Sequence, residues 1–127
     1  MFEKIDTSNA PKAIGPYTQA IKTGGWIFTS GQIPLHPVSN TVEATTIEGQ
    51  TEQVIQNLKA VLEAAGSSLD QTVKTTCFLQ NMSDFAAFNE VYAKHFTNKP
   101  ARSCVAAKEL PRNVLIEIDV VAVEGGR

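Results

Sequence analysis

Two oppositely charged residues near the end of the chain could do chemistry together. Arg102 lies in the stretch PARSCV, two residues after a proline, and Glu117 lies in IEIDVVAV among apolar residues. A guanidinium can bind an anion and a carboxylate can move a proton, so these residue types suit a site for a small charged substrate. The spacing alone equally allows a partly exposed salt bridge between neighbouring strands, worth about 1 kcal/mol or less.

The elements that must position this pair are the last two strands. We expect them at "ARSCVAA" and "VLIEIDVVAV", joined by a turn at Pro111–Asn113. If they pair about that turn, positions 102–104 lie opposite roughly positions 117–119. Arg102 and Glu117 would then both line one cleft.

The last strand also predicts an oligomer. Its apolar residues occupy both faces, with Val114, Ile116, Ile118, Val120 and Ala122 on one and Leu115, Val121 and Val123 on the other. Glu117 shares the second face, where an unpaired carboxylate would be unfavourable. A sheet wet on one side alternates apolar with polar residues, and nothing left in the chain can cover the second face. We therefore expect subunits to pack through it, and the cleft to lie where they meet.

The rest of the chain predicts a β-β-β-α-β-α-β-β order, beginning with a short strand at Phe2–Ile5. Thr23-Gly24-Gly25 separates two strand-like runs, as in a β-hairpin. An apolar stripe from Ile47 to Ala65 predicts a helix ended by Gly66, and alternation over 73–80 predicts a strand. Ser83 is the expected N-cap of a second helix, whose apolar stripe is Phe85, Phe88, Val91, Tyr92 and Phe96.

Composition limits the class of protein. The 127 residues are 43% hydrophobic and 19% charged with a net charge of −2, which fits one globular domain over 1–127. The scattered basic residues give no case for nucleic-acid binding, and no run predicts a signal peptide or a membrane span. Cys77 and Cys104 are expected to be reduced thiols in a cytoplasmic protein, and the isolated His36 and His95 predict no metal site.

Motifs along essentially the whole chain resemble the Rid (YjgF-type) enamine/imine deaminases. They are AIGPYTQAI, TSGQIP, LKAVLEAAG, VKTTCFLQNMSDFAAFNEVY and PARSCV…LP…VLIEIDVVAV, in that order. The resemblance implies a chorismate-mutase-like α+β domain, with a mixed sheet and two helices on one face. It also implies a homotrimer with three clefts between subunits and no cofactor.

The resemblance assigns roles to individual residues. Arg102 matches the arginine that binds the substrate carboxylate, and Glu117 matches the acid that handles the attacking water. Cys104 matches a position whose main chain helps to hold the ligand. The remaining matches are expected to line the cleft: Tyr17, Ser30, Gly31 and Asn89.

The activity implied is hydrolysis of 2-aminoacrylate-type enamines or 2-imino acids to 2-keto acids and ammonia. Two departures stand out: Lys99 precedes Pro100 after a shortened segment, and Asp119 stands where glutamate is common. The first bears on substrate preference. Two other functions compete with the deaminase: a non-catalytic trimeric binder of small 2-keto or carboxylic acids, and RNA cleavage or translation inhibition. The acidic balance argues against the latter.

Overall fold

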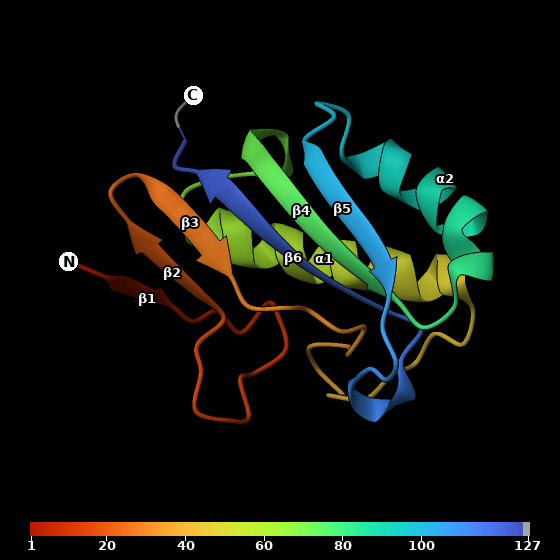
Figure 1. The fold of residues 1–127 in the computed structure, drawn as a ribbon. Coiled ribbons are helices and arrows are strands. Elements are labelled where there is room, and N and C mark those ends of the chain that lie inside the picture. The colour runs from red at the N-terminus through yellow and green to blue at the C-terminus, as the bar shows by residue number, and fades with distance from the viewer. Residues whose placement is uncertain (126–127) are drawn as a thin grey trace.

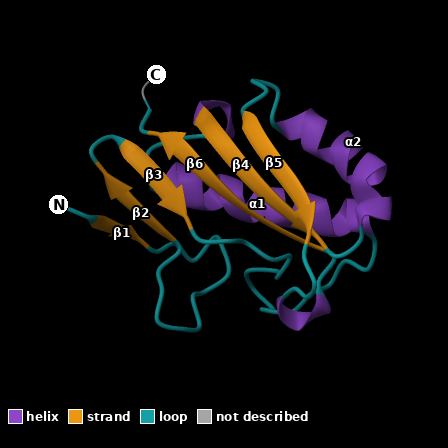
Figure 2. Ribbon diagram, viewed as in Figure 1, coloured by secondary structure: helices purple, strands orange, loops and turns teal. Residues whose placement is uncertain are grey.

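The computed structural model describes residues 1–125, which form one six-stranded mixed sheet with two helices packed on one face (Figure 1, Figure 2). The predicted element order and α+β class are confirmed, and the last two residues of the predicted 1–127 domain lie outside the described range. The strand order across the sheet is β1-β2-β3-β6-β4-β5. The strands are β1 (Glu3–Ile5), β2 (Ala20–Thr23), β3 (Trp26–Thr29), β4 (Thr72–Leu79), β5 (Ala101–Ala106) and β6 (Ile116–Val123), and the helices are α1 (Ile47–Ala64) and α2 (Phe85–His95).

The predicted hairpin is confirmed between β2 and β3, where Thr23 pairs with Trp26. Gly24 and Gly25 have φ of 58° and 83°. Positive φ at both central residues is the geometry of the turn that best matches the twist of two antiparallel strands. The hairpin continues into the sheet because β3 pairs antiparallel with β6.

The predicted pairing of the last two strands is wrong. β5 lies parallel to β4, with Arg102 beside Thr75, while β6 lies antiparallel on the other side of β4, with Glu117 beside Phe78. Because α2 connects β4 to β5, these strands form a βαβ unit, which places β5 at the sheet edge. The 3-10 turn at Pro111–Asn113 therefore links two strands that are not neighbours.

Helix α1 has clear signals at both ends. The Thr46 side chain accepts a hydrogen bond from the Gly49 amide, a cap worth about 1 kcal/mol, and Gly66 takes the left-handed conformation, with φ of 82°, that ends the helix. Its apolar stripe is fully buried against the sheet: Val54, Ile55, Leu58, Val61 and Leu62. Each such side chain stabilises the fold by roughly 1.5–3 kcal/mol.

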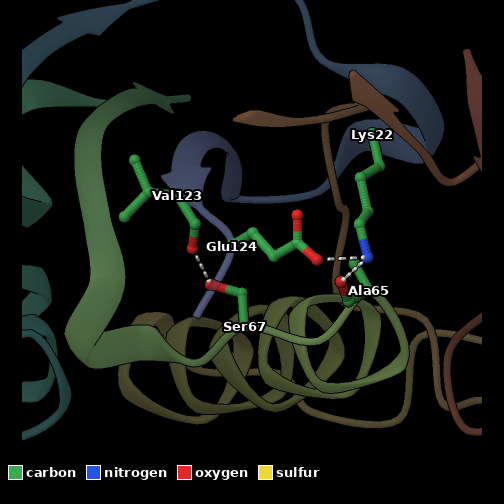
Figure 3. A network of polar contacts seen from close by, with 5 residues as sticks. All are labelled: Lys22, Ala65, Ser67, Val123 and Glu124. Carbon is green, nitrogen blue, oxygen red and sulfur yellow. Dashed lines mark hydrogen bonds and ion pairs between the residues drawn. The ribbon is translucent and has the colours of Figure 1, made fainter. Parts of the chain in front are cut away.

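Polar contacts tie the end of α1 to the sheet (Figure 3). Lys22 Nζ on β2 lies 3.0 Å from the Ala65 carbonyl and 3.1 Å from Glu124 Oε2, and Ser67 Oγ donates to the Val123 carbonyl at 2.6 Å. A cation beside the last carbonyls of a helix is favourable. These contacts fix the helix against β2 and the end of β6.

Two local predictions fail. Ser83 lies inside a 3-10 turn, Met82–Asp84, and α2 begins at Phe85 with no side-chain cap. Val73 is exposed, whereas Thr72 and Thr75 are buried, because a bulge between Thr72 and Lys74 shifts the alternation. The second helix itself is as predicted, with Phe88, Val91, Tyr92 and Phe96 buried.

The two faces of the sheet differ in burial, and apolar residues of β6 lie on both, as its sequence pattern predicted. Ile116, Ile118, Val120 and Ala122 are buried under the helices, and the alternate residues of β6 are half-buried on the open face. On that face Phe28 pairs with Val121 and Trp26 pairs with Val123, and both aromatic side chains remain more than 40% exposed. The homotrimer that would cover this face stays a prediction. Within residues 1–125, no helix combines the length and apolarity that crossing a membrane requires.

Candidate functional site

Arg102 lies on the helix side of edge strand β5 and is held by α2. Its guanidinium carbon is 4.8 Å from the ring centre of Tyr92, 5.5 Å from that of Phe85 and 5.7 Å from that of Phe88. We call these three rings the aromatic cage. A cation over aromatic faces is stabilised electrostatically without using its hydrogen-bond donors. The cage therefore fixes the guanidinium and leaves most of its N–H groups for a ligand.

Asn89 is the polar partner of this arginine. Arg102 Nη1 donates to Asn89 Oδ1 at 2.6 Å. An amide oxygen orients the guanidinium without neutralising its charge, as a carboxylate would. Both residues line a cavity of about 490 Å³ together with Tyr92, Ala93, Phe96, Thr97, Lys99 and Pro100, which we call the Arg102 cavity.

Glu117 lies on the opposite, open face, in a separate cleft of about 510 Å³ that also contains Tyr17, Ser30 and Gly31. We call it the Glu117 cleft. Backbone hydrogen bonds in both directions between Gln32 and Ile118 hold the chain after β3 against β6. This bridge places Gly31 directly over the Glu117 carboxylate.

The other members of the Glu117 cleft are positioned by the loop between β1 and β2. Ser30 Oγ donates to the Thr18 carbonyl at 2.6 Å, and the Ser30 amide donates to the Gln19 carbonyl. The buried Gln19 side chain in turn accepts from the Thr7 amide and donates to the Pro11 carbonyl. Tyr17 is about half exposed at the rim.

The electrostatics of Glu117 suit proton transfer. Burial, and then the nearby charge of Asp119, raise the pKa of this carboxyl above its ordinary value. The ion pairs formed among residues 1–125 are Lys22–Glu124 and His95–Glu52, so Glu117 has no cationic partner within the described protomer. A carboxylate without a fixed partner, and with a raised pKa, can both take up and release a proton.

Cys104 shows no sign of being a nucleophile. It is half-buried beside its register partner Cys77, and burial raises the pKa of both thiols, that of Cys77 to about 12. The thiol and not the reactive thiolate is therefore the dominant form at neutral pH. The role predicted for Cys104, which lies two residues after Arg102, is therefore that its main chain helps to hold the ligand.

Within one protomer Arg102 and Glu117 line separate cavities, and the predicted shared cleft where subunits meet stays a prediction. Parallel pairing puts Arg102 on the same face as buried Thr75, whereas Glu117 alternates with buried Ile118 and so faces the other way. The salt bridge considered as the alternative is not formed. Within one protomer the predicted residues divide into Arg102 with Asn89, and Glu117 with Tyr17, Ser30 and Gly31.

Sequence reasoning missed several residues of these two cavities. The sequence pattern of the aromatic cage predicted only a buried helix stripe. Its contact with the Arg102 guanidinium depends on the parallel pairing of β4 with β5, which was not predicted. Lys12, Gln19 and Arg112 line the Glu117 cleft but come from loops with no periodic pattern. No three His, Cys, Asp or Glu side chains within residues 1–125 gather where they could hold a metal ion, and the reaction's independence of metals stays a prediction.

Comparisons with known proteins agree with this arrangement of elements. The sequence profile of the family described as Endoribonuclease L-PSP matches residues 7–124. A RutC family protein of Pyrococcus horikoshii is 52% identical over 123 residues, which cover 96% of this chain and 98% of that one. The 2-iminobutanoate/2-iminopropanoate deaminase of Salmonella typhimurium is 45% identical, covering 97% and 98%. The crystal structure of Escherichia coli TdcF with bound serine superposes with a TM-score of 0.91 at 39% identity, covering 97% and 99%.

Proposed function

The chain belongs to the Rid (YjgF/RutC) family, and on that premise we propose that it hydrolyses 2-aminoacrylate-type enamines and 2-imino acids to 2-keto acids and ammonia. The observation that carries the proposal is the state of Arg102. Its guanidinium is caged by three rings and bonded to a neutral amide, and no Asp or Glu among residues 1–125 lines its cavity. Such a cation is prepared to bind a carboxylate.

Arg102 would act as the anchor. A guanidinium grips a carboxylate with two parallel hydrogen bonds and so fixes the plane of the attached imine. Holding the reactant in this way makes the attack of water effectively intramolecular. The serine bound to the relative from Escherichia coli also carries a carboxylate, which fits a site of this kind.

Glu117 would move the protons. The enamine first takes a proton on its terminal carbon and becomes the iminium. Water then adds to the iminium carbon while Glu117 accepts one of its protons, giving a carbinolamine. Glu117 returns that proton to nitrogen, the C–N bond breaks with the electron pair leaving on ammonia, and the hydroxyl proton is lost as the keto group forms. General acid–base help of this type is typically worth about 10²–10⁴-fold.

We further propose that the complete site forms between subunits of a homotrimer. Arg102 and Glu117 face opposite sides of the sheet with β4 between them, so one protomer cannot bring both to a substrate of a few atoms. Arg102 lies on an edge strand, and Glu117 lies beside the uncovered apolar face that includes Phe28 and Val121. Packing the edge of one subunit onto the open face of the next would bring the Arg102 cavity of one subunit to the Glu117 cleft of the other.

A trimeric binder of small 2-keto or carboxylic acids is the second candidate, because it would use the same arginine. Glu117 favours the enzyme: a second anion, half-buried and unpaired, brings nothing to a protein that only binds carboxylates. The raised pKa of Glu117 also suits a group that takes up and releases a proton.

The test is to generate imines in place. An amino-acid oxidase acting on alanine or 2-aminobutanoate supplies the 2-imino acid, and semicarbazide traps whatever remains unhydrolysed. We expect the protein to lower the trapped semicarbazone and to speed keto-acid formation. Equal trapping with and without the protein, together with measurable binding of 2-oxobutanoate, would favour the binder instead.

A further inference from the structure

We propose that Lys99 forms a second anion subsite in the Arg102 cavity, so that the protein prefers imino acids whose side chain ends in a carboxylate. This inference rests on the proposed function, since it takes Arg102 as the anchor of the first carboxylate. It names a substrate class, imino dicarboxylates such as the imines of glutamate and aspartate.

The charges that line the cavity are of one sign. Among the described residues, the charged ones that line it are Lys99 and Arg102, and the other lining residues are Asn89, Tyr92, Ala93, Phe96, Thr97 and Pro100. The chain as a whole has a net charge of −2, so this is a local reversal of sign. A hollow lined by charges of one sign and by apolar groups concentrates the field and attracts ligands of opposite charge.

Lys99 is not needed to position Arg102, so its charge is available for a ligand. Asn89 and the aromatic cage already orient the guanidinium, and neither of them needs Lys99. A single small carboxylate would be matched by Arg102 alone. A second cation in the same cavity can pair with a second negative group on a longer ligand.

The backbone fixes where the lysine side chain begins. Lys99 has φ of 55°, in the left-handed region that favours glycine or asparagine, and its amide donates to the Phe96 carbonyl at 3.2 Å. Lys99 is therefore held between the end of α2 and the start of β5, beside the cavity and three residues from the anchor.

The room in the cavity agrees with a longer ligand. In the single protomer its volume is about 490 Å³, within the range of ligand pockets, before a neighbouring subunit of the proposed trimer packs beside it. Ala93 and Thr97, which have small side chains, line part of the cavity, and Tyr92, Phe96 and Pro100 line other parts.

The experiment compares two imines in four proteins. The imines are those of alanine and glutamate, made in place by an amino-acid oxidase and followed by semicarbazide trapping. The proteins are the parent, Lys99→Asn, Lys99→Arg and Lys108→Asn. At position 99, asparagine removes the charge and tolerates the left-handed backbone, whereas arginine keeps the charge. Lys108→Asn controls for the change in net charge, because Lys108 is exposed and lines neither the Arg102 cavity nor the Glu117 cleft.

We expect Lys99→Asn to lower kcat/KM for the glutamate imine roughly three- to ten-fold and to lower it distinctly less for the alanine imine. Lys99→Arg and Lys108→Asn should behave like the parent. The difference between the two imines should shrink in high salt, because the lysine is exposed and its attraction is screened.

Equal loss on both imines, or no loss on either, would overturn the subsite. Calorimetric binding of 2-oxoglutarate and 2-oxobutanoate tests it without turnover: the parent should bind 2-oxoglutarate more tightly, and Lys99→Asn should abolish that difference. If the parent hydrolyses neither imine but keeps this binding preference, the deaminase proposal fails and the subsite stands. If it hydrolyses alanine imine and binds both keto acids equally, only the subsite fails.

Discussion

Gly31 packs directly on the carboxylate of Glu117. A Cβ at position 31 would fall 2.9 Å from Cδ and 3.2 Å from Cγ of that glutamate, closer than real side chains approach. The backbone of Gly31 is itself held by the Gln32–Ile118 bridge, so the side chain of Glu117 would have to give way. Because residue 31 is glycine, the Glu117 carboxylate can occupy the space beside its Cα.

Replacing Gly31 by alanine should therefore act through Glu117. Gly31 has no positive φ, so alanine fits the backbone, and we expect the free energy of unfolding to change by less than about 1 kcal/mol. Turnover of 2-imino acids should fall at least roughly ten-fold, because a displaced general base loses its geometry. Steady-state kinetics and chemical denaturation measure the two effects.

A double variant separates displacement from a general defect. If Gly31→Ala acts only by moving the carboxylate, then adding it to Glu117→Ala should cause no further loss of activity. Additive losses would mean that alanine at position 31 harms the cleft in another way.

Arg102→Ala should abolish accelerated hydrolysis while leaving the fold intact. Arg102 is half-buried and its removal leaves no acid unpaired, so stability should change little, whereas loss of the carboxylate anchor should lower kcat/KM roughly 10²–10³-fold. Arg102→Lys should recover only part of this, since an ammonium cannot make two parallel hydrogen bonds or stack in the aromatic cage. Parent-like acceleration by the alanine variant would exclude the anchor role.

Glu117→Gln should retain 2-oxobutanoate binding but lose roughly 10²–10⁴-fold in turnover. The same change should not destabilise the protein at neutral pH. The folded-state pKa of Glu117 is raised above its unfolded value by burial and by Asp119, so the fold favours the protonated acid and becomes less stable as pH rises through that range. The glutamine variant does not lose stability in this way. Denaturation of both proteins at pH 4 and pH 7 should therefore show that the variant's free energy of unfolding exceeds the parent's by more at pH 7 than at pH 4. Unchanged turnover would leave Glu117 a structural residue.

The Asp119 charge should contribute to the position of the acidic limb of the pH–rate profile, which Glu117 sets. The base form of Glu117 is needed for attack by water, so activity should rise with pH through its raised pKa. Burial is the larger cause of that shift and the Asp119 charge the smaller one. Asp119→Asn should therefore move the limb to lower pH without returning it to the ordinary range of a glutamate. A shift to higher pH, or none, would show that another group titrates.

Much of the fold follows from local chemistry in the chain. The β2–β3 turn needs positive φ at Gly24 and Gly25, and the apolar stripe of α1 indicates which side of that helix is buried. The apolar residues on both faces of β6 place this strand inside the sheet. Strand pairing did not follow, because adjacency in the sequence favoured β5 beside β6, whereas the crossover through α2 placed β5 beside β4. The bulge that turned Val73 outward likewise leaves no trace in the alternation of residue types.

The candidate site residues come from the motif resemblance and stay predictions, and their division between two cavities could not be predicted from the sequence. Periodicity alone assigned Glu117 to the open face, which the structure confirms, and it could not orient Arg102 because the partner of β5 was unknown. The aromatic cage illustrates the limit: Phe85, Phe88 and Tyr92 have the spacing of an ordinary buried stripe, and only the neighbouring strand reveals that the stripe also holds a cation.

The separation of Arg102 and Glu117 within one protomer makes the composite site directly testable. Arg102→Ala and Glu117→Gln should each be inactive alone. Unfolding the two variants together and refolding them should form mixed trimers, in which some sites combine an intact Arg102 from one subunit with an intact Glu117 from its neighbour. With random assembly of equal amounts, roughly a quarter of the sites would be complete.

Activity near a quarter of the parent's, absent when the two proteins are refolded apart and then combined, would establish that each site draws on two subunits. Phe28→Glu provides the matched test of the surface, because a charge on the exposed apolar face should prevent assembly, and light scattering should then give the mass of a single chain. A site contained in one protomer predicts the opposite on both counts: no recovery on mixing, since every chain carries one defect, and full activity in a monomeric Phe28→Glu variant. Either result would reject the inter-subunit arrangement, whatever the substrate.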